Sequence, residues 1–236
     1  MLTSEQKEKL LEQITLHMEP DKYGKTTIRN IYLDTDNFRL IRRSIEKPAY
    51  KEKLRIRSYA KATGDSTVFV ELKKKYKDVV YKRRLALCEK DAMAWVLGQK
   101  ECPQNTQISR EIDYFMNFYE NPKPSVFLSY DRQAYYDKDK GDFRITLDEN
   151  ILCRSDNISL CADVYGSPIL PQQNALMELK CSGGIPLWMT EILSKEKIYK
   201  TPFSKYGTAY SQLIFPEIHS KNMTTPKELI HNEYNI

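Results

Sequence analysis

The sequence predicts an α+β domain whose large antiparallel sheet closes into a barrel around a polar, basic interior, with helices packed outside. Two observations predict it. Several segments alternate charged and apolar residues with the period of a half-buried strand. The expected strands outnumber the helices and follow one another along the chain, as in an antiparallel sheet. Closing such a sheet would also remove its exposed edges.

Each element has a local signal in the sequence. Thr3 and Gln6 have the spacing of a capping box, which predicts a helix over the following residues, and Asp36 is expected to cap a short helix that carries Ile41. Further helices are expected at 90–98, 108–119, 185–195 and 205–214. Alternating or apolar segments predict strands at 26–35, 50–60, 67–75, 79–87, 125–136, 143–148, 158–164 and 175–180.

The composition predicts one domain rather than two. The chain has 236 residues, of which 41% are hydrophobic, and this is enough for one large core. We expect a single domain over residues 1–215 and a polar tail over 216–236. No internal repeat divides the chain.

Positive charge is concentrated in one part of the chain. Residues 39–90 hold seventeen Lys or Arg and six Asp or Glu, a local balance of +11, whereas the whole chain carries +5 and its remainder therefore about −6. Adjacent strand positions point to opposite faces of a sheet. Arg55 and Arg57 therefore share one face of their strand, and Leu54 and Ile56 share the other.

The same design recurs in four or more expected strands. Each of three expected strands carries a charged pair on one face: Glu71 with Lys73, Arg144 with Asp148, and Glu178 with Lys180. Arg132 is the corresponding residue of a fourth strand. Two like charges about 4 Å apart repel by roughly 4 kcal/mol at an effective dielectric constant near 20, so a closed cationic interior requires a polyanion. Alternatively, each charged face is solvated on an open sheet and binds nothing.

Several classes of site are disfavoured by the sequence. Five scattered cysteines without a C-x-x-C spacing predict neither a disulfide framework nor a zinc site, and three separated histidines disfavour histidine catalysis. No P-loop motif is present. The chain shows no signal-peptide pattern and no apolar stretch of membrane-spanning length, so a cytoplasmic location is expected. Trp95 and Trp188 are interpreted as packing residues.

Six blocks of the sequence resemble a known family. They are YKEKLRIRSY, VFVELKKKYKDVVYKRR, SYDRQAYY, FRITLD, LMELK and FSKYGTAY. In this order, over about residues 27–214, they are similar to the VTC domain, named for the vacuolar transporter chaperone complex. The resemblance implies the fold of the triphosphate tunnel metalloenzymes, an antiparallel barrel with a polar lumen. It also implies that polyphosphate is made from ATP with a divalent metal, usually Mn²⁺, with Mg²⁺ as the other candidate.

The resemblance also implies roles for individual residues. Glu178 would bind the metal, Lys205 would lie at one tunnel end, and Lys180 has the parity to join them. Either Arg42 or Arg43 would contribute as well, and the spacing does not decide between them. The residues expected to bind phosphate are Arg55, Arg57, Lys73, Arg132 and Arg144. Asp148 and Glu71 are candidates for metal or water binding, or equally for simple ion pairs with neighbouring cations.

One feature of the family is missing from this sequence. Its first strand, of the type E-R/K-K-Y, normally precedes the first helix, whereas here the chain starts with that helix. Either the sequence is a trimmed piece of a longer chain, or one barrel edge lacks a strand. The absence of an apolar span and of a regulatory domain predicts a stand-alone, bacterial-type member.

The predicted function is the transfer of the terminal phosphate of ATP to a growing polyphosphate chain. A tunnel-type triphosphatase is the first alternative, although the E-x-E-x-K strand typical of the hydrolases is absent. A non-catalytic polyphosphate-binding domain is the second. Nucleic-acid binding through the basic KKKYK block is disfavoured, because strand parity turns half of its charges inward.

Overall fold

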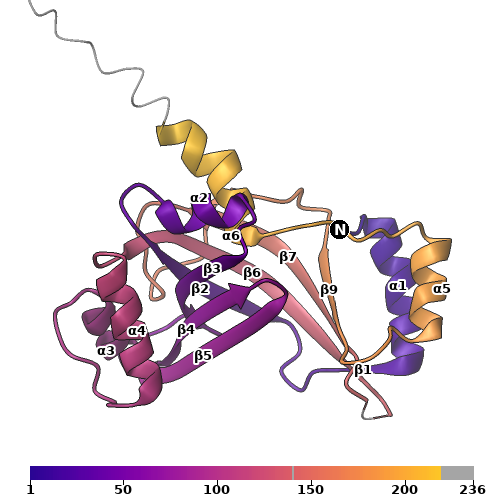
Figure 1. Ribbon diagram of the computed structural model, residues 1–236. Helices are drawn as coiled ribbons and strands as arrows, with labels where there is room; N and C mark the ends of the chain where they lie inside the picture. Colours follow the sequence, from indigo (N-terminus) through magenta and orange to yellow (C-terminus); the bar gives the residue numbers. More distant parts are fainter. Residues whose placement is uncertain (140, 219–236) are drawn as a thin grey trace, which may run out of the picture.

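One antiparallel sheet organises the part of the chain that the computed structural model describes, residues 1–139 and 141–218 (Figure 1). Its strands are β1 (Met18–Pro20), β2 (Thr26–Asp34), β3 (Tyr50–Ser58), β4 (Thr67–Tyr76), β5 (Val79–Cys88), β6 (Lys123–Asp137), β7 (Arg144–Arg154), β8 (Ser167–Pro168) and β9 (Leu176–Lys180). The helices are α1 (Ser4–His17), α2 (Arg39–Ile45), α3 (Glu89–Val96), α4 (Gln107–Phe118), α5 (Leu187–Lys195), α6 (Lys205–Ala209) and the π-helix η1 (Tyr210–Ile214). The α+β class is confirmed.

The sheet is open, so the predicted closed barrel is wrong. Its strands follow the order β5-β4-β3-β2-β6-β7-β8, with β1 paired to β6 and β9 paired to β7. Within the described residues β5 pairs with β4 and β9 pairs with β7, but β5 and β9 do not pair with each other. They therefore form two separate edges. Alternation of charged and apolar residues reports which face of a strand is buried, whereas closure depends on backbone pairing between edges.

The strand expected at 158–164 does not form. The strand β7 instead continues to Arg154, and residues 158–164 adopt turns and irregular backbone. Leu160 is fully buried, with Ile158 and Cys161 packed beside it against the core under α3 and α4. These apolar residues therefore anchor a loop to the core and do not form a ladder.

Helices cover the apolar faces of the two ends of the sheet, as Figure 1 shows on its left and right sides. Leu54, Ile56, Val70 and Leu72 are fully buried in the cluster that includes residues of α3 and α4. At the other end, Ile145 and Leu147 of β7 pack with residues of α1 and α5. The strand parity predicted from the sequence is confirmed in these segments.

A third cluster lies where α6 and η1 pack against β2 and β6. It includes Ile28, Tyr130, Tyr206 and Tyr210, and the Tyr206 ring stacks on Tyr32 with centroids 4.7 Å apart. Figure 1 places α2 and α6 together at one end of the sheet. This packing brings the first residues of α6 to the polar side chains of β3 and β7.

The capping carboxylate of α2 is Asp34 and not Asp36, which corrects the sequence prediction. Asp34 is fully buried and accepts hydrogen bonds from the backbone N–H groups of Leu40 and Ile41, at 2.9 and 3.0 Å. It also accepts one from the Tyr206 hydroxyl at 2.9 Å. Asp36 is exposed and forms only an ion pair with Lys123. Phe38 adopts a left-handed conformation, which folds the loop back so that the earlier aspartate reaches the helix.

Replacing Asp34 with asparagine is expected to lower the free energy of unfolding by about 2–3 kcal/mol. An amide NH₂ group would face donors that now share the carboxylate, and at least one would lose its partner. Thermal unfolding should show a midpoint lowered by about 5–10 °C. The matched variant Asp36→Asn should change the stability by less than about 0.5 kcal/mol, and equal losses in both variants would contradict the assignment.

Most of the predicted polar tail lies outside the described residues. The tail was predicted over 216–236; residues 215–218 are helical, and 219–236 are not described. Within residues 1–139 and 141–218, no helix combines the length and hydropathy needed to cross a bilayer.

Candidate phosphate-binding site

One face of the sheet carries the charged residues predicted from strand parity, and we call it the charged face. Its members on β3 and β4 are paired across strands: Arg55 lies opposite Glu71, and Lys53 lies opposite Lys73. On β6, β7 and β9 the corresponding pairs are Arg132 opposite Asp148, Thr146 opposite Glu178 and Arg144 opposite Lys180. The register thus places the predicted site residues on one continuous face.

Glu71 is the centre of the cationic cluster on β3, β4 and β5. It is 1% exposed, and its Oε2 accepts a hydrogen bond from Arg55 Nε at 2.8 Å. Its Oε1 accepts one from Arg84 Nε at 2.7 Å and lies 2.9 Å from Lys82 Nζ. Burial opposes ionisation of this carboxyl, but the charges of Arg55, Arg57 and Lys82 outweigh it and lower its pKa to about 2. Glu71 is therefore an anion committed to its cationic neighbours.

Asp148 has the same role at the other side of the charged face. Arg132 binds it with two parallel hydrogen bonds of 2.6 and 2.7 Å, and Lys205 Nζ lies 2.6 Å from its Oδ2. Burial raises the pKa of the Asp148 carboxyl, whereas Arg132 and Lys205 lower it, and the net direction is down. The ion pair with Lys205 fixes the start of α6 against the sheet. Of the two roles left open for Glu71 and Asp148, the structure shows the ion pairs.

Polar side chains that the sequence analysis missed hold the two arginines of β3. Arg57 is 6% exposed and donates to Asn30 Oδ1 at 3.0 Å and to the Tyr130 hydroxyl at 3.1 Å. Arg55 donates to the Tyr32 hydroxyl at 3.1 Å. Burial opposes ionisation of Tyr32, but Arg55 and Lys53 lower the pKa of its hydroxyl to about 8. These partners come from β2 and β6, so their proximity follows from register and has no local sequence signal.

Three lysines of the charged face lack an anionic partner. Among the described residues no carboxylate oxygen lies within 4.0 Å of the amino groups of Lys51, Lys53 or Lys73. Burial and the neighbouring cations lower the pKa of Lys53 to about 8, although Tyr32 opposes this. The pKa of Lys73 is lowered by burial and by Arg55. Uncompensated cations of this kind are where an anionic ligand gains the most.

The charged face also brings residues of distant strands under one another's influence. The charge of Glu178 on β9 raises the pKa of Lys73 on β4, against the larger effect of burial, and it also raises that of Arg132 on β6. Arg144 stacks over the Tyr136 ring at 4.7 Å, and its buried Nε has no hydrogen-bond partner among the described residues. Although the sheet is open, Glu178 of β9 thus lies close enough to influence both Lys73 of β4 and Arg132 of β6.

The charged face offers a divalent metal a single carboxylate that is free of arginine. Glu178 is half exposed and lies 3.3 Å from Lys180 Nζ, whereas Glu71 and Asp148 are engaged by arginines. No group of three or more His, Cys, Asp or Glu in the described residues could hold a metal by itself. Mg²⁺ and similar ions are often held by one or two carboxylates together with substrate phosphates. Glu178 fits that arrangement and does not fit a metal site made of protein ligands alone.

The two arginines of α2 that were alternative site candidates lie away from the charged face. Arg42 is exposed and donates to the Asn37 carbonyl at 3.4 Å, and Arg43 is exposed on the side of Tyr119, so neither joins the site. Arg83 and Arg84 point to opposite faces: Arg83 contacts Glu111 of α4, whereas Arg84 binds Glu71. The charged face also contains three cations that were not predicted, although their strand parity identifies them: Lys53, Lys82 and Arg84.

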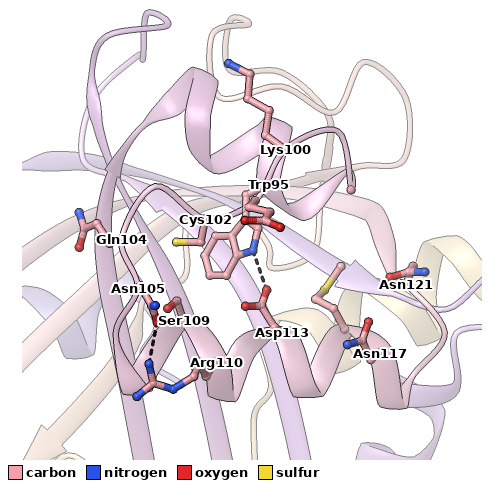
Figure 2. A pocket seen from close by; sticks show the side chains of 13 residues that line it. Trp95, Lys100, Cys102, Gln104, Asn105, Ser109, Arg110, Asp113, Asn117 and Asn121 are labelled. Atoms are coloured by element: carbon pink, nitrogen blue, oxygen red, sulfur yellow. Dashed lines mark hydrogen bonds between the residues drawn. The ribbon is translucent and has the colours of Figure 1, made fainter.

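A separate cavity of about 560 Å³ lies beside α3, α4 and the loop between them (Figure 2). Trp95 lines it and donates its indole N–H to Asp113 at 2.7 Å, as the close-up shows. Its lining contains none of the predicted site residues. Trp95 belongs to the core under α3 and α4, which agrees with its interpretation as a packing residue.

Comparison with known proteins decides the family. The family model described as "VTC domain" matches residues 1–214. The chain belongs to the VTC domain family. This confirms the resemblance based on the six sequence blocks, and it extends the match to the amino terminus. Among curated proteins, none matches this VTC domain with significance.

One solved structure shows a similar overall fold at low sequence identity. A candidate adenylate cyclase from Bacillus halodurans superposes on this VTC domain with a TM-score of 0.54 and 16% identity, over 86% of this chain and 90% of that one. A second candidate adenylate cyclase, from Vibrio parahaemolyticus, gives 0.43 and 10% over 86% and 91%. A protein from Pyrococcus horikoshii gives 0.39 and 14% over 89% and 94%.

Proposed function

We propose that this VTC domain is an ATP-dependent and metal-dependent polyphosphate polymerase. Family membership supports a phosphate-handling function, and the observation that carries the proposal is the charge pattern of the charged face. Arg55, Arg57 and Arg132 are fixed by buried partners, whereas Lys53 and Lys73 have no carboxylate partner in the described residues. A ligand with several adjacent negative charges matches both features.

The side chains can support phosphoryl transfer without a covalent intermediate on the protein. A terminal oxygen of the acceptor chain attacks the γ-phosphorus of ATP. The bond between that phosphorus and the β–γ bridging oxygen breaks, and ADP leaves with its electron pair. Such a reaction depends mainly on positioning and charge stabilisation. Arg55, Arg57 and Arg132 would bind and orient the phosphate oxygens and stabilise charge on the equatorial ones, and Lys73 would complete the shell.

Other residues would set the two ends of the bound triphosphate. Lys205 is held by Asp148 and lies 4.5 Å above the Tyr130 ring, so its amino group has a defined position near Arg57 and Arg132. Arg144 and Lys180 would bind phosphate from β7 and β9. Glu178 would hold Mn²⁺ or Mg²⁺ together with phosphate oxygens. The bound metal would supply charge neutralisation between those oxygens.

Incubation of the purified protein with ATP and Mn²⁺, with gel separation of the products, tests the proposal. We expect a ladder of long phosphate chains, absent when the metal is chelated, and at least about tenfold weaker with Glu178→Gln. Orthophosphate as the only product would replace the polymerase with a triphosphatase. Tight binding of tripolyphosphate without turnover in the presence of Mn²⁺ or Mg²⁺ would indicate a non-catalytic binding domain. Absence of binding to both ATP and tripolyphosphate would refute the phosphate site.

A further inference from the structure

A ladder of lysines runs along the charged face and continues past the residues expected to hold the reacting triphosphate. Lys53 of β3, Lys73 of β4 and Lys82 of β5 form one row of cross-strand neighbours. Lys51 of β3 and Lys75 of β4 form the next row, two residues further along both strands. Directly opposed side chains have Cβ atoms about 5 Å apart, and like charges in this arrangement destabilise a sheet. A folded protein without a ligand gains nothing from such a ladder.

The outer row differs from the inner ones in its partners. The row of Arg55, Glu71 and Arg84 contains its own carboxylate, and Lys82 reaches the same one. By contrast, among residues 1–139 and 141–218 the Lys51 amino group donates to the Ser44 carbonyl alone, at 3.2 Å, and Lys75 pairs with the fully exposed Asp78 alone, at 3.8 Å. Lys74, which lies between Lys73 and Lys75 on β4, points to the other face of the sheet and pairs with Glu52. The outer row is thus less well compensated than the inner ones, because its single carboxylate partner in the described residues is fully exposed.

Electrostatics agree with the geometry of the ladder. Burial lowers the pKa of Lys51, and the charges of Lys75, Lys73 and Lys47 lower it further, in this order. The repulsion therefore runs along the ladder from Lys73 to the outer row. Two residues along a strand span about 6.7 Å. A chain of phosphates that begins at Arg55 and Lys73 therefore reaches Lys51 and Lys75 with its more distant units.

We propose that Lys51 and Lys75 form a distal subsite for inorganic polyphosphate and that the product chain leaves the charged face over this end of β3 and β4. The inference rests on the proposed function, because it takes Arg55, Arg57 and Lys73 as the site of the reacting triphosphate. The subsite binds phosphate units that tripolyphosphate is too short to supply. It retains long chains between transfers and so sets product length.

The experiment compares one double variant with a control variant that loses the same number of positive charges elsewhere on the protein. Lys51→Gln with Lys75→Gln removes the outer row. Lys61→Gln with Lys90→Gln removes two lysines that are paired with the exposed Asp163 and Asp65, away from the charged face. Binding of tripolyphosphate and of long-chain inorganic polyphosphate is measured for each protein by calorimetry at one ionic strength. Thermal unfolding checks each fold, and loss of the Lys51–Lys75 repulsion should leave the melting midpoint unchanged or higher.

The outer-row variant should bind long-chain polyphosphate about three- to tenfold more weakly, with tripolyphosphate affinity within about twofold of the wild type. In the synthesis assay it should release shorter chains at an unchanged initial rate of ATP consumption, while the control behaves as wild type. Equal loss for both ligands, loss in the control, or no change in either affinity would overturn the subsite. Absence of wild-type binding to both ligands would instead refute the proposed function.

Discussion

Replacing Arg55 and Arg57 together with alanine is expected to abolish polyphosphate synthesis and to weaken tripolyphosphate binding by at least about 10²-fold. Hydrogen bonds to charged groups contribute about 1.5–3 kcal/mol each, and both arginines are already held in place, by Glu71 and Tyr32 and by Asn30 and Tyr130. Little ordering is therefore needed when phosphate binds. Calorimetry with tripolyphosphate and ATP measures the loss of affinity, and the gel assay measures the loss of polymer.

Two further variants test whether the planar guanidinium groups matter beyond their charge, and whether their position on the charged face matters. Arg55→Lys with Arg57→Lys keeps the charge but removes the planar donors, so we expect affinity to fall by about tenfold or more. Arg83→Ala is the matched control, because Arg83 lies on β5 but faces Glu111 of α4 on the other side of the sheet. Affinity in that control should stay within about twofold. A folded double-alanine protein with wild-type affinity would place the phosphate elsewhere.

The sequence was sufficient to predict which side chains share a face. Burial of alternate residues is a local property, and it was read correctly for Leu54 and Ile56 against Arg55, and for Ile145 and Leu147 against Arg144. The capping box at Thr3 is also local and is confirmed, with the Gln6 N–H bonded to Thr3 Oγ1 at 3.2 Å. Side-chain period and short-range hydrogen bonds suffice for such features.

Features that depend on distant partners were not predictable in the same way. Asp34 caps α2 because a left-handed Phe38 folds the loop back, whereas the sequence prediction chose Asp36, which lies nearer to the helix in the chain. The engagement of Glu71 by cations of β3 and β5 follows from cross-strand register. Closure of the sheet depends on two edge strands that are far apart in sequence, β5 and β9, and alternation says nothing about edges.

Replacing Glu71 with glutamine is expected to destabilise the ligand-free protein by about 3–5 kcal/mol, since one buried carboxylate compensates several cations of the charged face. An amide of the same shape would leave Arg55, Arg57, Lys82 and Arg84 to repel one another. Chemical unfolding measures the loss. Glu111→Gln is the control, because Glu111 pairs with Arg83 and Lys74 on the partly exposed outer face and should lose at most about 1 kcal/mol.

Acid should weaken the wild type through the same carboxylate. The pKa of Glu71 lies near 2 in the folded protein and near 4.5 when unfolded, so its ionisation adds stability above pH 4.5. That contribution, of the order of 3 kcal/mol, is lost as the pH falls from 4.5 towards 2, and Glu71→Gln should lack this part of the pH dependence. Stability curves that stay parallel over this range would contradict the assignment.

Phosphate should partly restore the glutamine variant, and this links the stability of the fold to its proposed ligand. With the internal carboxylate gone, the cations of β3 and β5 have only an external anion to compensate them. The variant should therefore bind tripolyphosphate more tightly than the wild type, and saturating tripolyphosphate should raise its melting midpoint by more, because stabilisation by a ligand of the native state grows with affinity. The opposite order would mean that Glu71 positions Arg55 and Arg57 for phosphate more than it competes with phosphate for them. In that case the folded variant would also bind tripolyphosphate more weakly than the wild type, and calorimetry on the same samples separates the two cases.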